Sequence, residues 1–466
     1  MPPPGAIVAV LAFAGLSASF MFTLLVPIQS KLPELLDASR EDTAWVVTAT
    51  LLAAAVVTPI AGRLGDMYGK RRIALVLVAV MIAGSVIAAL SHGIVGMIVG
   101  RALQGAVTGV IPLSISILRD VLHEDRVDGA IALISATLGV GGALGLPLSA
   151  TVTEAGDWHA VFWVSAGLGV AVVVLIAWIV PPSTLRTAGR FDYLGAAGLA
   201  VGLIGILLAV SRGNEWGWSS GATLACGLGG VAVLLGWGWY ELRISEPLLD
   251  LRVAARRPVL LTNIASIAMG FALFASNVLF AQQLELPTDV GGFGLPLLTA
   301  SLMVMPAGLV MMVLSPSSGR LARTVGPRLL LVLGAIALIV AYGFVLLFLS
   351  SVWHIFVANV LVGVGIGFGY ASMPMLIMRS VPQEETGASN GLNALFRSLG
   401  TSSAAAVVGA VLASMSTVRD GVQVPTPAAF DLSYALGAVA AVIALVLAAF
   451  IPRHPHDESR PALPER

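Results

Sequence analysis

The sequence has 466 residues, of which 58% are hydrophobic and only 11% are charged, and its 25 basic and 25 acidic side chains cancel. A soluble globular chain carries about 25% charged residues, so this chain lacks the polar surface that a water-soluble domain requires. The composition excludes a soluble enzyme, a disordered protein and a nucleic-acid binder. It predicts an all-α polytopic membrane protein.

Few residues have the chemistry of a cofactor or metal site. Cys226 is the only cysteine, and no group of Cys and His residues has metal-ligand spacing. The chain has no G-x-x-x-x-G-K-[ST] loop, which argues against a pump powered by ATP. Met1–Gly5 carries no basic residue, so we interpret the first apolar run as a retained helix and not as a signal peptide. We expect no metal and no organic cofactor.

A helix needs about 20 apolar residues to cross a bilayer. The sequence contains fourteen such runs, and the connections between them are short, so we expect no sizeable soluble domain. In chain order the runs cover residues 5–27, 43–62, 73–91, 94–118, 128–151, 159–180, 194–211, 221–240, 259–281, 297–316, 329–350, 354–378, 387–416 and 431–451.

The basic residues predict the orientation of these helices, because positively charged connections stay in the cytoplasm. With both termini inside, most Lys and Arg residues fall in inner connections. The outer connections then hold only Lys31, Arg40, Arg212 and Arg419. We therefore expect both chain termini to be cytoplasmic.

An internal repeat predicts the architecture. Residues 62–72 (GRLGDMYGKRR) have a degenerate copy at residues 319–328 (GRLARTVGPR), and the same displacement brings the fifth run onto the thirteenth. Parallel halves of this kind imply a transporter with a site between them. The expected organisation is a six-helix bundle over 1–185, two inserted helices with flanking inner loops over 186–258, a second six-helix bundle over 259–451 and a cytoplasmic tail over 452–466.

Several segments carry a resemblance to a known family. Residues 62–72 resemble motif A of the major facilitator superfamily, and residues 100–105 (GRALQG) resemble its motif B. The 6+2+6 helix count resembles the fourteen-helix drug:proton antiporter branch, as do residues 158–162 (WHAVF) and 190–192 (RFD). The resemblance covers nearly the whole chain. It implies a major facilitator fold with 14 transmembrane helices, and a transporter instead of an enzyme.

The resemblance assigns a conformational latch to the motif A residues Gly62, Asp66, Gly69, Lys70 and Arg71. In the family the Asp contacts the basic residues of the loop and a helix terminus of the other half, where a helix N-terminus stabilises an acid by roughly 0.3–1 kcal/mol. The glycines permit a tight turn with positive φ. The alternative is a loop that only sets topology. The second copy has Arg323 in place of the acid, so we expect it to be structural.

Polar side chains inside spans are expected to face the bundle interior. The family places Arg101 near the substrate cavity, and Gln104 shares its helix face. Asn390, Asn393 and Arg397 share one face of the thirteenth run, and Asn263 lies in the ninth. We predict that these residues line a polar cavity between the halves. The alternative for Arg101 is a residue that pins a helix contact.

The glycine-rich fifth run resembles the antiporter motif C of the family, with departures. Gly141, Gly145 and Pro147 match it, but Leu146 separates the Gly-Pro pair and the closing Gly-Gly is absent. Small residues let helices approach closely, and proline favours a kink. We predict a bent, closely packed helix at the seam between the halves, with helix packing alone as the alternative.

The chain also departs from the branch in its acids. The branch commonly has an Asp in the first helix where this chain has Leu24, and no run holds a carboxylate near its centre. Glu154, at the outer end of the fifth run, is our candidate for the proton-carrying group. Arg101 and Arg397 predict a positive cavity that prefers neutral or anionic amphiphiles to quaternary ammonium compounds. The alternative is that backbone carbonyls or an edge acid neutralise each arginine.

These observations predict a multi-pass transporter of the cell membrane. We expect a monomer that exports hydrophobic or amphiphilic small molecules, such as drugs or secondary metabolites, and is driven by the proton gradient. Its partners would be the small-molecule substrate, protons and the lipid bilayer, with no nucleic acid. The alternatives are a metabolite symporter or facilitator, or a dedicated exporter of an endogenous product.

Overall fold

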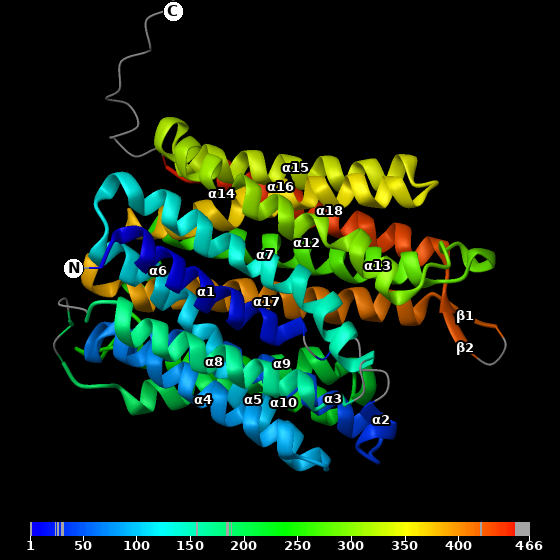
Figure 1. The fold of residues 1–466 in the computed structure, drawn as a ribbon, viewed down its shortest axis with the longest axis horizontal. Helices are drawn as coiled ribbons and strands as arrows, with labels where there is room; N and C mark the ends of the chain where they lie inside the picture. Colours follow the sequence, from blue (N-terminus) through cyan, green and yellow to red (C-terminus); the bar gives the residue numbers. More distant parts are fainter. Residues whose placement is uncertain are drawn as a thin grey trace, which may run out of the picture.

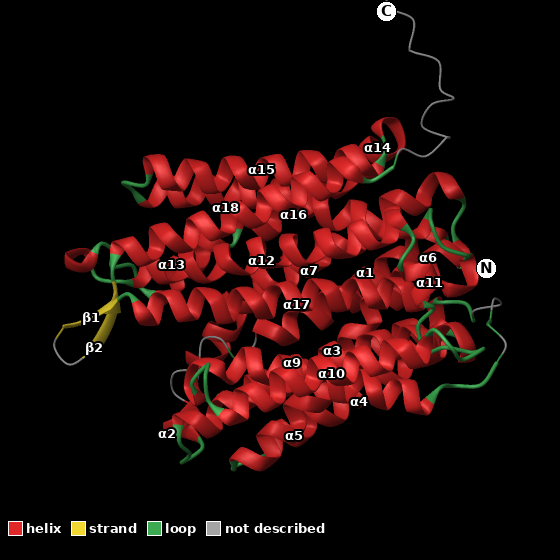
Figure 2. Cartoon of the chain, turned by 180° about the vertical axis from the view of Figure 1, so that it is seen from behind, coloured by secondary structure: helices red, strands yellow, loops and turns green. Residues whose placement is uncertain are grey.

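A computed structural model of the chain describes residues 2–23, 25, 28, 32–154, 157–182, 186–187, 189–419 and 422–452. Within these residues, 14 helices are long and apolar enough to cross a membrane, which confirms the predicted number of spans. The helices run side by side, and their connections gather at two opposite ends of the bundle (Figure 1, Figure 2). The helix that begins the chain starts at the end where the last long helix finishes (Figure 1).

The first half contains six spans and one short helix. They are α1 (Pro4–Thr23), α2 (Leu32–Leu35), α3 (Arg40–Tyr68), α4 (Lys70–Leu90), the combination of α5 (Ile94–Gly105), η2 (Ala106–Gly109) and α6 (Val110–Val121), then α7 (Glu124–Glu154) and α8 (Ala160–Ile179). The inserted pair is α9 (Tyr193–Trp216) and α10 (Gly221–Glu241), followed by the short α11 (Leu251–Ala254).

The second half repeats this arrangement. It contains α12 (Arg257–Glu285), η3 (Thr288–Val290), α13 (Leu297–Val304) with α14 (Pro306–Val325), α15 (Pro327–Phe348), α16 (Val352–Met378), η4 (Gln383–Glu385), α17 (Thr386–Ser414) and α18 (Pro427–Phe450). A hairpin of β1 (Ser416–Arg419) and β2 (Val422–Pro425) precedes α18, with Ser416 paired to Pro425. The sequence did not predict this hairpin.

The repeat is visible in the two motif A segments. Gly69 is the single residue between α3 and α4, and Gly326 is the single residue between α14 and α15. Their φ angles are 103° and 85°, a region that glycine enters without the strain a Cβ would cause. We call the end of the bundle that carries these two connections the motif A end. The sequence placed the other motif A residues in a loop as well. That prediction is wrong for Gly62 and Asp66, because both lie inside α3.

Two spans that were expected to be continuous are interrupted. The fourth span passes from α5 to α6 through one 3₁₀ turn, and the tenth changes from α13 to α14 at Met305. Pro306 cannot donate a backbone hydrogen bond, and the next free donor, the N–H of Ala307, is satisfied by Oδ1 of Asn359 at 2.7 Å. A side chain of α16 therefore stabilises the break in α13–α14.

The two largest apolar clusters each lie mainly in one half but extend across the seam, and the inserted helices attach from outside. Leu199, Leu203 and Leu207 of α9 share a buried cluster with Ala55 of α3 and Leu392 of α17. Helices α9 and α10 meet at small residues, since a Cβ on Gly230 would stand 2.8 Å from the carbonyl oxygen of Gly202. Lipid gives little hydrophobic drive for association, so such close backbone contacts hold the pair together.

One residue assigned to an outer loop belongs to a helix. The seventh span was expected to end at residue 211, but α9 continues to Trp216. Arg212 is therefore inside the helix, with 1% of its surface exposed. Its guanidinium lies 4.4 Å from the ring centre of Trp45 and pairs with Glu215. Stacking and pairing explain why the cation is stable there.

Residues 158–162, which carry part of the family resemblance, form the turn before α8 and its first residues. The N–H of His159 donates to Oδ1 of Asp157 at 2.9 Å, and this bond holds the pKa of the Asp157 carboxyl below its ordinary value. Trp158 is buried and contacts the ring of Phe162. These contacts fix the turn that enters α8.

Candidate functional site

The carboxylate of Asp66 joins the two halves at the motif A end. Asp66 lies in the last turns of α3 and is 1% exposed. It accepts hydrogen bonds from the backbone N–H groups of Gly387 at 3.1 Å and Ala388 at 2.8 Å, in the first turn of α17. These donors have no partner within their own helix, and the positive end of the helix dipole favours an anion there. This geometry is what the motif A resemblance implies for a latch.

Glycines let α3 and α17 come close enough for this contact. A Cβ on Gly62 would stand 2.3 Å from the carbonyl oxygen of Gly387, and a Cβ on Gly387 would stand 2.6 Å from Oδ1 of Asp66. Both distances are below any real Cβ contact. Gly62 was expected to make a turn, but its role in the structure is to admit a helix of the other half.

Lys70 completes a buried charge network behind the latch. Its ammonium group is 2.8 Å from Oδ2 of Asp120 and 3.8 Å from Oδ1 of Asp66, and the lysine is 0% exposed. It also donates to the hydroxyl of Thr386 in the second half at 3.2 Å. From the sequence, Asp120 was only one of several acids at span edges that could carry a proton, and neither it nor Thr386 was expected to join the latch. The only available signal was an acid at the end of the fourth span, at the same membrane edge as the basic run.

Arg71 does not contribute to the latch. Its guanidinium donates to the carbonyl oxygen of Ala177 near the end of α8, within the first half. The last carbonyls of a helix lack partners inside the helix and attract a cation. The expected latch role of Arg71 is therefore replaced by a contact that ties α4 to α8.

The second copy of the motif makes an equivalent contact between the halves, with an arginine where the first copy has an acid. A Cβ on Gly319 would stand 2.4 Å from Cα of Gly129, which repeats the approach between Gly62 and Gly387. Arg323 donates to the carbonyl oxygen of Asp125 in the first turn of α7. The motif A end is thus closed at two places, α3 against α17 and α14 against α7.

Replacing Gly62 by alanine is expected to hold the motif A end open. The new methyl group must displace the Gly387 carbonyl, and such overpacking costs about 1–3 kcal/mol, which lowers the closed population by about tenfold. We would measure labelling of a cysteine introduced at Ser389, in a Cys226→Ala background, with an impermeant maleimide. The control is Gly343→Ala in α15, because a Cβ there meets nothing within 4 Å. Equal labelling of both variants would contradict the expectation.

Arg101 is enclosed by the first half. Its Nη1 donates to the carbonyl oxygen of Met21 in α1 at 3.1 Å and to Oε1 of Gln104 at 2.8 Å, and the side chain is 2% exposed. Gln104 in turn donates to Oγ of Ser85 in α4 at 2.8 Å. The geometry favours the alternative reading, in which Arg101 pins helices and a backbone carbonyl offsets its charge.

The polar residues of the second half are only partly brought together. Nδ2 of Asn393 donates to Oδ1 of Asn263 at 3.0 Å, which links α17 to α12. Asn390 instead donates to the carbonyl of Thr386 in its own helix. The guanidinium carbon of Arg397 lies 4.9 Å from the ring centre of Tyr370 in α16. Asn263 and Asn393 thus form a pair, whereas Asn390 contributes to neither contact.

The motif C-like residues pack α7 in two directions. A Cβ on Gly141 would stand 2.5 Å from Cβ of Ser19 in α1, so this glycine serves a contact within the first half and not the seam. The seam is formed by Gly139, whose carbonyl oxygen would lie 2.4 Å from a Cβ on Gly308 of α14. Gly145 and Pro147 lie within α7, which continues to Glu154. The side chain of Glu154 lies outside the described residues.

Two carboxyl groups meet at the base of the inserted pair. Oδ2 of Asp192 and Oε1 of Glu241 would both lie within 2.4 Å of a Cβ on Gly195, so they face each other across that glycine. Both oxygens are buried, and neither has a hydrogen-bond partner among the described residues. Like charges this close repel each other. Residues 190–192 stood out in the sequence, but nothing in the sequence connected them to Glu241.

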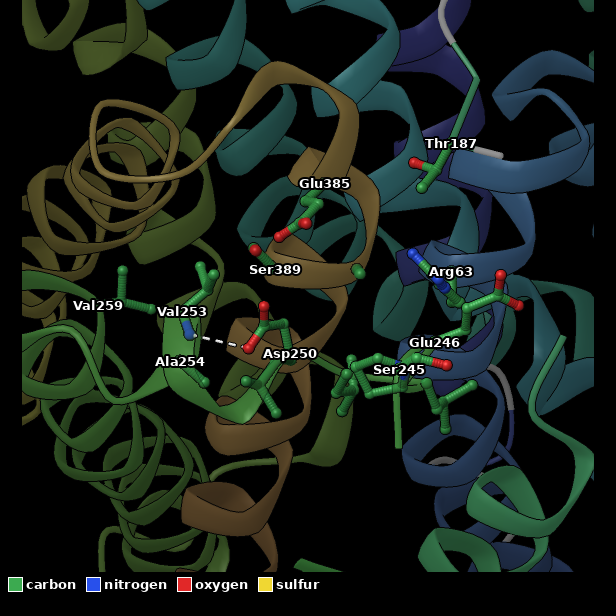
Figure 3. Close-up of a pocket in the computed structure, with 15 residues that line it drawn as sticks. Arg63, Thr187, Ser245, Glu246, Asp250, Val253, Ala254, Val259, Glu385 and Ser389 are labelled. Carbon is green, nitrogen blue, oxygen red and sulfur yellow. Dashed lines mark hydrogen bonds between the residues drawn. The ribbon is translucent and has the colours of Figure 1, made fainter. Parts of the chain in front are cut away.

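A cavity of about 200 Å³ lies beside the latch. Arg63 of α3, the start of α17 and residues 245–250, 253 and 254 line it, and Arg63 and Glu246 lie on the same side of the view (Figure 3). Glu385 and Asp250 project towards the same space from the two other sides (Figure 3). The lining mixes these four charged side chains with apolar ones, so this cavity does not fit a purely apolar substrate site.

The linker before α9 also bridges the latch. The N–H of Thr187 donates to the carbonyl oxygen of Asp66 at 2.8 Å. Its hydroxyl donates to the carbonyl oxygen of Glu384 at 2.9 Å. One residue of the inserted segment therefore contacts both halves where they close.

Comparison with known proteins identifies the class. The profile of the Major Facilitator Superfamily matches residues 11–405, so the chain belongs to this superfamily. This is a superfamily of membrane transporters, which are not enzymes, and the 14 candidate spans of this chain fit a multi-pass membrane protein. The crystal structure of the human organic anion transporter MFSD10 superposes with a TM-score of 0.64 at 16% identity, over 95% of this chain and 100% of that one, which shows the shared fold.

Three proteins illustrate which members of the superfamily this chain is similar to. An uncharacterised MFS-type transporter of Mycobacterium tuberculosis is 28% identical over 88% of this chain, which spans 60% of that protein's length. The lincomycin resistance protein LmrB of Listeria monocytogenes is 27% identical over 73% of this chain and 72% of its own length. The tetracenomycin C resistance and export protein of Streptomyces glaucescens is 26% identical over 81% of this chain and 70% of its own length.

Proposed function

We propose that this chain exports hydrophobic or amphiphilic small molecules by alternating access and takes its energy from the proton gradient. The observation that carries the proposal is the contact of Asp66 with the start of α17. This contact joins the two halves and can form only while the motif A end is closed. An interaction that exists in one state only is what biases a two-state equilibrium.

The direction of transport is proposed from the relatives. One is named for resistance to lincomycin, and another for resistance to and export of tetracenomycin C. Both are similar to this chain over most of its length. We propose the same direction here, with the motif A end and both termini in the cytoplasm of a monomer in the cell membrane.

We propose two candidate sites for the group that carries the proton. Glu154 remains the candidate from the sequence. The pair Asp192 and Glu241 is the candidate from the structure, because two carboxyl groups with buried oxygens that lack described partners face each other there. Neither candidate requires a metal or an organic cofactor.

Dissipating the proton gradient is expected to raise the retention of a fluorescent amphiphilic dye in cells that produce this chain. Export against a gradient stops when its driving force is removed, whereas an importer would show reduced dye entry. The readout is cell-associated fluorescence before and after a protonophore, compared with cells that lack the chain. Retention that is the same in both strains would contradict the proposal.

A dedicated exporter of one compound is the second candidate. It is favoured by the single compound named for the Streptomyces glaucescens relative. A panel of chemically unrelated dyes separates the two, because a multidrug exporter lowers the retention of several dyes and a dedicated exporter lowers that of one scaffold at most.

A further inference from the structure

We propose that the guanidinium of Arg397, held over the ring of Tyr370, binds the anionic group of an amphiphilic substrate. The inference rests on the proposed export function and names the substrate class. The expected ligand combines an apolar or aromatic body with a carboxylate, sulfonate or phosphate.

Arg397 is fixed at a junction of three helices of the second half. It lies inside α17, and a Cβ on Gly270 of α12 would stand 2.5 Å from its carbonyl oxygen and 3.4 Å from its Cγ. The guanidinium carbon lies 4.9 Å from the ring centre of Tyr370 in α16, which is 2% exposed. The backbone and the stem are therefore held by α12, and the charged group is placed by α16.

The charge of Arg397 has no partner among the residues that the structure describes. Among the described residues, none forms an ion pair with it and none accepts a hydrogen bond from its guanidinium. The ring of Tyr370 attracts the cation but leaves its N–H donors unused. A cation within a span is costly without a counter-charge, so a half-buried arginine in this position is suited to receive an anion from outside the chain.

Arg101 shows what a structural arginine looks like in this fold. It also lies within a span, but Met21 and Gln104 accept its hydrogen bonds and only 2% of its surface is exposed. Arg397 is half-buried and keeps accessible surface. Guanidinium groups bind planar anions through two parallel hydrogen bonds, and Arg397 has this capacity free among the described residues.

The neighbouring side chains fit this role. The ring of Tyr370 is buried, so it holds the guanidinium in place and leaves the contact with the ligand to the charged group itself. The amide of Asn393 lies about one helical turn away along α17. It donates to Asn263 of α12, and neither amide carries a charge that would compete with an anion. The cluster is positive and contains no described carboxylate.

Three probes with one scaffold test the proposal: pyrenebutyrate, its methyl ester and pyrenebutyltrimethylammonium. We would measure their binding to the purified full chain in lipid nanodiscs by pyrene fluorescence. Arg397→Gln is expected to weaken pyrenebutyrate binding by about tenfold or more while changing ester binding by less than about twofold, because only the anion loses a charge-assisted bond. Arg397→Lys is expected to keep part of the preference for the anion.

The matched control is Arg243→Gln. Arg243 also stacks on an aromatic ring, with its guanidinium carbon 3.9 Å from the ring centre of Trp239, but it is exposed at the end of α10. Its replacement is expected to leave all three affinities unchanged. The thermal unfolding midpoint of each variant shows whether the fold is intact.

Two results would overturn the inference. One is an equal loss for the anion, ester and cation in Arg397→Gln, which would mean that Arg397 only supports the structure. The other is unchanged pyrenebutyrate binding. In either case, export of the ester or the cation by cells would leave the proposed function standing, whereas absence of export for all three probes would count against that function itself.

Discussion

Replacing Asp66 by asparagine is expected to abolish most transport while the protein still inserts into the membrane. Asparagine keeps the shape and one acceptor oxygen but loses the charge that two backbone N–H groups and Lys70 share. Hydrogen bonds to a charged group contribute about 1.5–3 kcal/mol, so the closed state would lose about tenfold or more in population. Dye efflux from cells, with the amount of protein in the membrane measured in parallel, gives the readout.

Asp250→Asn is the matched control for this variant. Asp250 also accepts two backbone N–H bonds at a helix start, from Arg252 at 2.8 Å and Val253 at 3.3 Å, but all three residues belong to one segment. We expect Asp250→Asn to leave efflux near normal. Near-normal efflux in Asp66→Asn would show that the contact of Asp66 with α17 is not a latch that transport requires.

Replacing Lys70 by methionine is expected to have the largest effect on stability. The change leaves Asp120 and Asp66 buried without their cation, and breaking a buried ion pair in this way costs about 3–5 kcal/mol. Removing the second charge as well, in Lys70→Met with Asp120→Leu, is expected to restore at least half of the loss. Denaturant or thermal unfolding of the purified protein in micelles measures both.

Arg72→Met provides the comparison in the same helix. Arg72 is exposed, so its loss is expected to change the free energy of unfolding by less than about 0.5 kcal/mol. If Lys70→Met changed the free energy of unfolding as little as Arg72→Met does, the buried network at the motif A end would not stabilise the protein.

The spans could be predicted because hydropathy and length are local properties of the chain. Helix ends were less predictable, since the apolar run ends at Gly62 and at residue 211, whereas the helices continue to Tyr68 and Trp216. Polar residues extend a helix when a partner elsewhere satisfies them, as Trp45 and Glu215 do for Arg212. The sequence does not display such partners.

The candidate site was predictable where a motif names a residue and not where it depends on distant contacts. Asp66 was identified from its motif. Asp120 and Thr386, which complete the network around Lys70, are 50 and 316 residues away from that lysine in the chain. The two span arginines have the same sequence character, and only the structure shows that Arg101 is enclosed by acceptors while Arg397 is half-buried with no described acceptor.

Uptake into inside-out membrane vesicles tests the central claim, proton-driven export, most directly. With the vesicle lumen acidified, an amphiphilic dye should accumulate in vesicles that contain the chain. A protonophore should abolish this accumulation, and vesicles with the Asp66→Asn variant should show none. Accumulation that is independent of the proton gradient, or that occurs only in vesicles of the opposite orientation, would contradict the proposed mechanism.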